Sequence, residues 1–329
     1  MKVGIGNPDS TGEPRSRKAT HGISSPVTTR KGDPDVPHQP KFSICQLSTP
    51  DTTFEEDLRL TRDAGATGIA LAEEKLREGE EEAQLEALRA SGLKATLCLP
   101  TNIAVLPIQP QIIYAGPPDP ATRISLMCDS LRRLAPFEPD SVVVGTGSEV
   151  GFELEEANRI AVEGLREAAD VAADLGLRLA IEAPRRDLGF DGTYVRGLPA
   201  LVKLIDEIDR PNVGICYDVY HHWDEPDPIG NAERYANRII GVQVNDWREP
   251  PRSFADRLVP GEGTLDLPGI FAALERGGFD GWYDFEIFSD DGRWGTDLPD
   301  SLWKLPPEEL VRRGMTGMQD AVAAAAGVR

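Results

Sequence analysis

Two short runs, RLAIEA over residues 178–183 and NVGICYD over residues 212–218, show the pattern on which this chain of 329 residues is built. Each run is rich in aliphatic residues, as in a buried strand, and each carries a carboxylate at or next to its end. Short runs rich in aliphatic residues recur six more times: FSICQL from Phe42, TGIALA from Thr67, KATLCL from Lys94, SVVVG from Ser141, IIGVQVND from Ile239 and GWYDFEIF from Gly281. Longer amphipathic stretches separate the runs, so the sequence predicts eight strands that alternate with helices.

Helix signals support this alternation. TFEEDLRLTRDAG begins at the capping residue Thr53 and ends at Gly65, while EEANRIAVEGLREAADVAADLG ends at Gly176. Eight strand–helix units over about 290 residues match the size of a (β/α)₈ TIM barrel. A doubly wound sheet is the alternative, but it usually has fewer strands, and no GxGxxG motif stands at a first strand–helix turn. We therefore predict an α/β protein with a single barrel domain.

The two ends of the chain differ from this pattern. Residues 1–40 are rich in Gly, Pro, Ser, Thr and charge without a hydrophobic period, so we expect a disordered tail. Residues 41–329 would form the barrel with a C-terminal extension. Part of that extension, PDSLWKLPPEEL from Pro299, would close the site or meet a second subunit in a homo-oligomer.

Composition narrows the class of partner. Lys and Arg number 35 against 55 Asp and Glu, a formal net charge of -20, so we expect neither nucleic acid nor an anionic membrane as a partner. Cys45, Cys98, Cys128 and Cys216 are far apart, which suits core residues in a reducing compartment. No apolar stretch approaches the roughly 20 residues of a membrane span, and the N-terminus lacks a secretion-signal core. We expect a soluble, cytoplasmic protein that binds a small molecule.

Polar residues collect where the last four predicted strands end. These residues are Glu182, Asp218, Gln243 and Glu286. Functional side chains of a barrel lie at the C-terminal ends of its strands, and a carboxylate in an apolar strand is costly to bury unless it is paired or bound to a cation. A divalent metal held by all four is the simplest common partner. The alternative is that each is an ordinary strand-end residue with hydrogen bonds to a loop.

The motifs around these residues are IEA from Ile181, YDVYH from Tyr217, VQVNDW from Val242, DRLVPGEG from Asp256 and YDFEIFSDDG from Tyr283. In order and spacing they resemble the xylose isomerase-like superfamily of sugar isomerases and epimerases, over about Lys41 to Trp303. The resemblance implies that Glu182, Asp218, Gln243 and Glu286 occupy the metal-ligand positions. It also implies that His221 is the histidine after the strand-six ligand and that Arg257 contacts substrate.

Gln243 departs from the family pattern, because most relatives have histidine there. Four oxygen ligands, three of them anionic, form a hard set that suits Mn²⁺ or Mg²⁺ better than zinc. The superfamily also contains endonuclease IV, but that activity uses a histidine-rich zinc cluster. This chain has 4 histidines, and His21 and His38 lie in the expected tail.

Weaker candidates surround the predicted metal site. Lys75 follows the second strand, where it would reach a substrate oxygen or face solvent. Asp246 and Asp256 would orient the metal ligands or Arg257, or else form simple salt bridges. Asp246 is also a candidate substrate contact. Asn245 should share the strand face of Gln243. We assign no role in the site to the tryptophans.

The resemblance implies a metal-dependent sugar isomerase or epimerase acting on a keto-sugar or related polyol. A proton would be abstracted through a metal-stabilised enediolate, with Glu182, Glu286 and His221 as catalytic residues. One alternative is a lyase or dehydratase that eliminates an aglycone or water from a 3-keto-glycoside or inosose. Another is a non-catalytic sugar-binding barrel. Long segments from Pro100 and Trp247 would cover the barrel mouth, and their apolar content suits a hydrophobic part of a substrate.

Overall fold

The computed structural model describes residues 40–109 and 116–327, so the expected tail lies outside the described residues apart from Pro40. All eight predicted strands are present, and the third is divided at Thr96 into two short pieces. The strands are β1 (Lys41–Cys45), β2 (Gly68–Ala70), β3 (Lys94–Ala95), β4 (Leu97–Cys98), β5 (Ser141–Gly145), β6 (Leu179–Glu182), β7 (Val213–Asp218), β8 (Ile239–Val244), β9 (Asp246–Trp247), β10 (Arg257–Leu258) and β11 (Trp282–Phe285).

The main sheet is a parallel barrel, as predicted. Its strand order is β3-β2-β1-β11-β8-β7-β6-β5-β4, and β3 and β4 are the two halves of one barrel strand, which closes the ring. A doubly wound sheet is thereby excluded. The register brings the C-terminal ends of neighbouring strands together: Gly145 of β5 is paired with Glu182 of β6, and Asp218 of β7 with Gln243 of β8.

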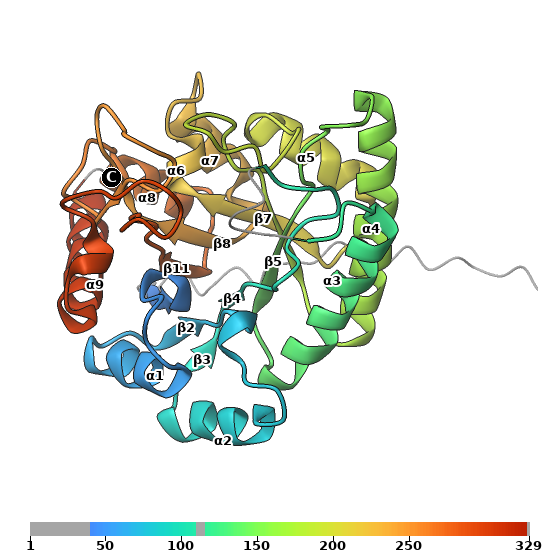
Figure 1. Cartoon of the computed structure of the whole chain (residues 1–329). Coiled ribbons are helices and arrows are strands. Elements are labelled where there is room, and N and C mark those ends of the chain that lie inside the picture. The colour runs from blue at the N-terminus through green and yellow to red at the C-terminus, as the bar shows by residue number, and fades with distance from the viewer. Residues whose placement is uncertain (1–39, 110–115, 328–329) are drawn as a thin grey trace, which may run out of the picture.

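Helices follow the barrel strands and surround the sheet, as Figure 1 shows. They are α1 (Phe54–Asp63), α2 (Glu81–Ser91), α3 (Pro120–Leu134), α4 (Leu154–Asp174), α5 (Gly197–Ile208), α6 (Val219–His222), α7 (Pro228–Tyr235), α8 (Leu267–Arg276) and α9 (Pro307–Ala325). Thr53 caps α1 as expected, because its side chain accepts a hydrogen bond from the Glu56 amide and Glu56 accepts one from the Thr53 amide. Gly65 and Gly176 follow their helices with φ of 85° and 74°, which glycine adopts without strain.

The C-terminal segment completes the barrel. The short 3₁₀ turn η5 (Leu302–Lys304) leads into α9, the helix that follows β11 and thus belongs to the eighth strand–helix unit. Gly314 of α9 allows this helix to approach closely, because a Cβ there would lie 2.5 Å from the Phe285 ring. The helix therefore packs directly on the strand that precedes Glu286.

The barrel interior is filled by apolar side chains beneath the mouth, among them Leu97, Val143, Ala180 and Cys216. Gly241 of β8 leaves room for this packing, since a Cβ at that position would lie 2.4 Å from Leu97. A larger apolar layer lies between the strands and the helices. All four cysteines are buried free thiols, in agreement with their predicted place in the core.

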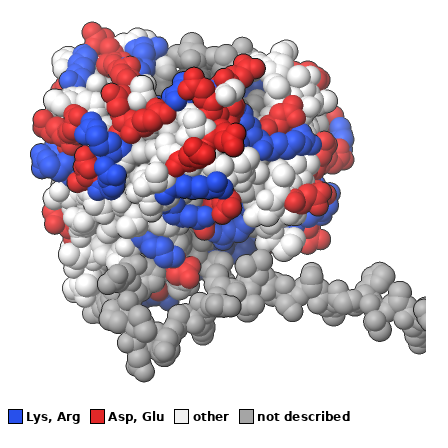
Figure 2. Space-filling model, turned by 90° about the horizontal axis from the view of Figure 1, so that it is seen from below, with Lys and Arg blue, Asp and Glu red and all other residues white. Residues whose placement is uncertain are grey.

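The surface carries charges of both signs. On the face shown in Figure 2, acidic and basic side chains lie next to one another. Exposed ion pairs on the surface include Arg77 with Glu55 and Arg159 with Glu163. Within residues 40–109 and 116–327, no helix is both long enough and apolar enough to cross a membrane.

Candidate active site

The four predicted metal ligands lie together at the barrel mouth. Glu182 and Asp218 are the last residues of β6 and β7, Gln243 is in β8, and Glu286 directly follows β11. Asp218, Gln243 and Glu286 are buried, and Glu182 keeps 13% of its side chain exposed. Asp218 also caps α6, because its Oδ1 accepts a hydrogen bond of 2.9 Å from the Tyr220 amide. The barrel frame therefore fixes all four positions.

Arg257 connects two of these carboxylates. Its Nη1 donates to Asp218 Oδ2 at 2.9 Å and to Glu286 Oε2 at 2.8 Å. The antiparallel β9–β10 ribbon above the barrel positions this arginine, whose side chain is only 3% exposed. The guanidinium also lies over the rings of Tyr220 and Phe288, at 4.8 Å and 4.4 Å from their centroids. A fixed positive charge thus sits among the buried acids.

Gln243 belongs to the same network. Its Nε2 donates to Glu286 Oε1 at 2.6 Å, and its Oε1 accepts from the Cys216 thiol at 3.1 Å. Asn245 shares the orientation of Gln243, as predicted, and donates to Asp218 Oδ1 at 2.9 Å. In this arrangement the amide nitrogen of Gln243 faces Glu286. A half-turn of the amide exchanges its two polar atoms and would present the oxygen there instead.

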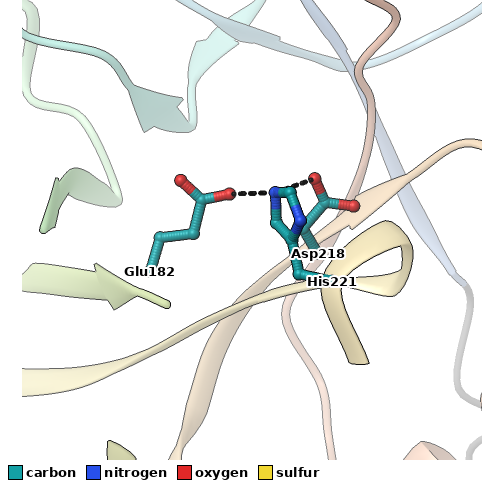
Figure 3. Close-up of side chains that lie close together, drawn as sticks. All are labelled: Glu182, Asp218 and His221. Carbon is teal, nitrogen blue, oxygen red and sulfur yellow. Dashed lines mark ion pairs between the residues drawn. The ribbon is translucent and has the colours of Figure 1, made fainter. Parts of the chain in front are cut away.

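His221 lies between Glu182 and Asp218, as Figure 3 shows. Its Nε2 is 3.4 Å from Glu182 Oε1 and 3.4 Å from Asp218 Oδ2. Its other ring nitrogen, Nδ1, accepts a hydrogen bond of 3.3 Å from the backbone amide of Arg185. Because an accepting nitrogen carries no proton, the Arg185 amide selects the tautomer with the proton on Nε2. His221 therefore presents an N–H group to the carboxylates.

The carboxyl groups of Asp218 and Glu286 differ in acidity. Burial alone would raise the pKa of Asp218, but the charge of Arg257, the neighbouring His221 ring and hydrogen bonds from the Tyr220 amide and Asn245 hold that pKa below its ordinary value. Burial raises the pKa of Glu286 well above its ordinary value, because Arg257 opposes this only in part while Asp218 and Glu182 add to it. The site thus sets one anionic carboxylate beside one that retains its proton more readily.

The residues present fit a divalent cation. Within the part of the chain that the structure describes, ligand atoms of Glu182, Asp218 and His221 lie within 4.8 Å of one another. Glu286 is linked to this cluster by Arg257, which donates hydrogen bonds to both Glu286 and Asp218. With Glu286 ionised, three carboxylates against one guanidinium leave two negative charges uncompensated, which is the deficit that a divalent ion would neutralise, and such an ion would displace the proton that Glu286 otherwise retains. Since the Nε2 proton prevents His221 from acting as a ligand in this tautomer, the carboxylates are the better donors.

A cavity opens above these groups. Its polar lining includes Glu182, His221, Arg257 and Glu286. The expected mouth segments from Pro100 and Trp247 both contribute to its walls. The remaining lining residues are largely apolar: Leu99, Ile103, Ala104, Ile108, Gly145, Pro184, Phe190, Gly192, Phe254, Phe288 and Trp294, together with Arg185 and Tyr220.

The structure does not bring every predicted residue to the cavity. Lys75 forms a nearly buried ion pair of 2.6 Å with Asp57, so it neither lines the cavity nor faces solvent. Asp246 accepts hydrogen bonds from the backbone amides of Gly261, Gly263 and Leu265 and thereby fixes the PGEG turn. Its role here is to support the loop that carries Arg257.

Asp256 forms the salt bridges that were the simpler of its two predicted roles. Its Oδ1 lies 2.9 Å from Arg248 Nε and 2.7 Å from Arg252 Nη2. These contacts hold the chain immediately before Arg257.

Sequence reasoning missed the aromatic wall. Phe190, Phe254 and Phe288 lie in segments that follow β6, β9 and β11, and each lines the cavity. The available signal was the presence of aromatic residues in irregular segments downstream of catalytic strand ends, where a folded core does not require them. Arg185 was missed because its contribution to the site is a backbone amide, which no side-chain pattern reveals.

Comparison with known proteins agrees with this fold. A family model described as the xylose isomerase-like TIM barrel matches residues 58–321. The inosose dehydratase of Geobacillus thermodenitrificans is 26% identical over 151 residues, covering 41% of this chain and 49% of that protein. The hydroxypyruvate isomerase of Escherichia coli is 29% identical over 137 residues, covering 41% of this chain and 50% of that protein. The chain thus spans about half the length of the curated relatives it matches.

Solved structures extend the likeness to the whole barrel. A protein of Sinorhizobium meliloti has a TM-score of 0.72 and 26% identity, covering 85% of this chain and 98% of its own. The IolI protein, solved with a zinc atom, has a TM-score of 0.70 and 20% identity, covering 86% of this chain and 98% of its own. At 20% identity this second likeness shows the fold alone. Because the family model covers most of the chain, the protein belongs to the xylose isomerase-like TIM barrel family.

Proposed function

We propose that this protein is a sugar isomerase or epimerase that removes a proton from a carbon next to the carbonyl group of a keto-sugar or related polyol. The observation that carries the proposal is the convergence of Glu182, Glu286, His221 and Arg257 on one cavity at the catalytic end of the barrel. Family membership and the isomerases and dehydratases among the curated relatives support an enzymatic role.

Glu182 is the base in this proposal. Its carboxylate reaches the cavity, and the His221 ring holds it without blocking it. Glu286 would return a proton from its own side of the cavity, since its raised pKa favours the protonated form. Return to the neighbouring carbon gives isomerisation, and return to the opposite face of the same carbon gives epimerisation.

Two donors would stabilise the negative charge that develops on the substrate oxygen. The Nε–H of Arg257 is buried and lacks a hydrogen-bond partner among the residues that the structure describes. Buried donors are normally hydrogen-bonded, and a substrate oxygen in the cavity would accept a hydrogen bond from this N–H group. The Nε2–H of His221 is the second donor. Both groups are held in place before substrate arrives, so little reorganisation is required.

Glu182, Asp218, Gln243 and Glu286 would hold the divalent cation, for which this oxygen-rich set favours Mn²⁺ or Mg²⁺. When bound, the cation would polarise the substrate carbonyl and offset negative charge on its oxygen. The chain's own part is to orient the carboxylates, through Arg257 on Asp218 and Glu286 and through Asn245 on Asp218.

Deuterium exchange tests the proposal. The protein is incubated in D₂O with Mn²⁺ or Mg²⁺ and a panel of ketoses and 3-keto-glycosides, and deuterium in the recovered sugar is measured by NMR. We expect exchange at a carbon next to the carbonyl, and its loss in the Glu182→Gln and Glu286→Gln variants. Glu163→Gln is the matched control, because that carboxylate lies on the exposed face of α4, where it pairs with Arg159. Undiminished exchange in Glu286→Gln would contradict its role.

Elimination is the second candidate, and the raised pKa of Glu286 favours it. A leaving group next to the site of proton loss needs a proton on its oxygen, and the Glu286 carboxyl, which retains its proton more readily than Asp218, would provide it. The carbon's electron pair then forms a double bond, the carbon–oxygen bond breaks, and water or an alcohol departs. The same incubations distinguish this outcome, since the released aglycone or unsaturated product is visible by NMR. With neither exchange nor release from any substrate, the non-catalytic binding barrel would be favoured.

A further inference from the structure

The residues that line the cavity are of two chemical kinds. Glu182, His221, Arg257 and Glu286 are charged or polar, and most of the others form a wall of aromatic and aliphatic side chains. Phe190, Phe254 and Trp294 form a continuous row in this wall: the Phe190 and Phe254 rings are 5.3 Å apart at 26°, and the Phe254 and Trp294 rings 5.8 Å apart at 19°. We call these three residues the aromatic row.

The aromatic row is built from separate parts of the chain. Phe190 belongs to the segment after β6, Phe254 precedes β10, and Trp294 follows β11. Phe288 packs edge-on against Trp294 at 5.2 Å and also contacts the Arg257 guanidinium. Each ring remains partly accessible rather than closed into the core. Three mouth segments thus place an apolar surface directly beside the groups proposed to react.

The aromatic and aliphatic wall of the cavity offers few hydrogen bonds to a polyol. No Ser, Thr, Asn or Gln side chain is among the described residues that line the cavity. Arg185 lines it, but its guanidinium is paired with Asp187 and Asp224 and lies over the Trp247 ring at 4.4 Å. The hydroxyls of a free sugar facing the aromatic row would therefore lose water without gaining partners, which weakens binding.

We propose that the aromatic row is a subsite for a flat, apolar substituent of the substrate, and that the substrate is a glycoside whose keto-sugar ring carries an aromatic aglycone. The sugar ring lies among Glu182, His221 and Glu286, and the aglycone packs against Phe190, Phe254 and Trp294. An aromatic group fits because ring–ring contacts add to the free energy gained by burying apolar surface. The assignment of the sugar ring rests on the proposed function, whereas the apolar subsite rests on the lining of the cavity alone.

Equilibrium binding tests the subsite without turnover. Titration calorimetry compares phenyl β-D-glucopyranoside with methyl β-D-glucopyranoside, neither of which has the carbonyl needed for reaction. We expect the phenyl compound to bind at least about tenfold more tightly, as its larger apolar area predicts. The preference should fall to about threefold or less in Phe254→Ala and Trp294→Leu, since each removes an aromatic contact. Phe254→Leu covers the case in which the alanine variant does not fold.

Phe42→Leu is the matched control, because Phe42 lies in β1 at the end of the barrel away from the mouth. This variant should retain the full preference for the phenyl compound. Equal affinity for the two glycosides, or a preference that survives in both Phe254→Leu and Trp294→Leu, would overturn the proposal.

Exchange in D₂O with the corresponding 3-keto-glucosides separates the two hypotheses. Exchange without a phenyl preference refutes the subsite and leaves the proposed function standing. A phenyl preference without exchange from any keto-sugar supports the subsite and refutes the enolising activity. With both correct, Phe254→Leu should lower kcat/KM for the phenyl 3-keto-glucoside more than for the methyl compound, mainly through KM.

Discussion

Arg257 is the residue whose position most affects the charge balance of the site. It is buried and pairs with both Asp218 and Glu286, and among the described residues no other arginine or lysine is paired with either carboxylate. Two carboxylates buried without a counter-charge would be strongly destabilising. The sequence placed Arg257 before the PGEG turn, but the pattern did not show that the guanidinium compensates the predicted metal ligands.

Arg257→Met should therefore destabilise the fold. We expect the free energy of unfolding to fall by roughly 3–5 kcal/mol, because Asp218 and Glu286 lose their partner. Urea denaturation of the metal-free protein measures the loss, and Arg257→Lys should restore part of it. Arg313→Met is the control, since Arg313 forms a more exposed pair with Glu262 and should contribute at most about 1 kcal/mol. A variant Arg257→Met as stable as the wild type would show that the carboxylates do not depend on this charge.

Asp284 makes stability depend on pH. This fully buried residue of β11 is in register with Ser43 and Gln243, and burial, with the nearby charge of Asp218, raises its pKa to about 8 although the Ser43 hydroxyl opposes the shift. The folded state thus keeps a proton that the unfolded chain releases near pH 4. The stabilisation is complete below that pH and is lost as the pH rises through the folded-state pKa, at about 1.4 kcal/mol per pH unit.

Asp284→Asn should flatten this dependence. Urea denaturation between pH 6 and 8, with a chelator present, should show the wild type losing roughly 2 kcal/mol more than the variant. The amide keeps the shape of the carboxyl group but does not titrate in this range. Parallel stability curves for the two proteins would show that Asp284 is already ionised at pH 6.

At the scale of elements, the ribbon of β9 and β10 places Arg257 and depends on Asp246. Asp246 Oδ2 accepts from the Gly261 and Gly263 amides at 2.8 Å and 3.0 Å, and Oδ1 accepts from the Leu265 amide at 3.0 Å. Gly263 permits this contact, because a Cβ there would lie 2.4 Å from Asp246 Oδ1. The PGEG motif is therefore a turn that wraps around one carboxylate.

Asp246→Ala should loosen this turn and displace Arg257. We expect kcat/KM to fall by about 10–100-fold and the unfolding free energy by roughly 2–4 kcal/mol, since three backbone donors lose a charged acceptor. Hydrogen exchange should quicken at the amides of Gly261, Gly263 and Leu265 in particular, which a general loss of stability would not produce. Glu262→Gln, in the same turn but on its surface, should leave both exchange and activity unchanged.

The sequence predicted the elements better than their side-chain contacts. Hydrophobic periodicity identified all eight strands, and the helix start signal identified the Thr53 cap, because both features depend on residues that are close in sequence. Lys75 shows where such reasoning fails: its partner Asp57 lies on the preceding helix, and only the folded chain brings the two together. The aromatic row was equally hidden, since its three rings come from segments that no local pattern connects.

At the scale of the whole molecule, a formal net charge of -20 affects every measurement with cations. Self-repulsion weakens as ionic strength rises, so any added salt should raise the melting temperature to some extent. A stabilising effect of Mn²⁺ or Mg²⁺ is therefore evidence for a site only when the ionic strength is held constant. The excess of acid also concentrates cations around the molecule, and this effect does not require the barrel mouth.

Metal addition at constant ionic strength tests the predicted site at this scale. After chelator treatment, Mn²⁺ or Mg²⁺ at about 100 times its Kd should add about 2.7 kcal/mol to the unfolding free energy. Asp218→Asn removes a central ligand and should abolish this increment, while Glu163→Gln changes the net charge equally and should retain it. Gln243→His should shift the preference toward zinc, because an imidazole replaces an amide oxygen in an otherwise hard ligand set. If all four proteins respond alike to every cation, the stabilisation comes from the surface field, and the barrel mouth holds no metal.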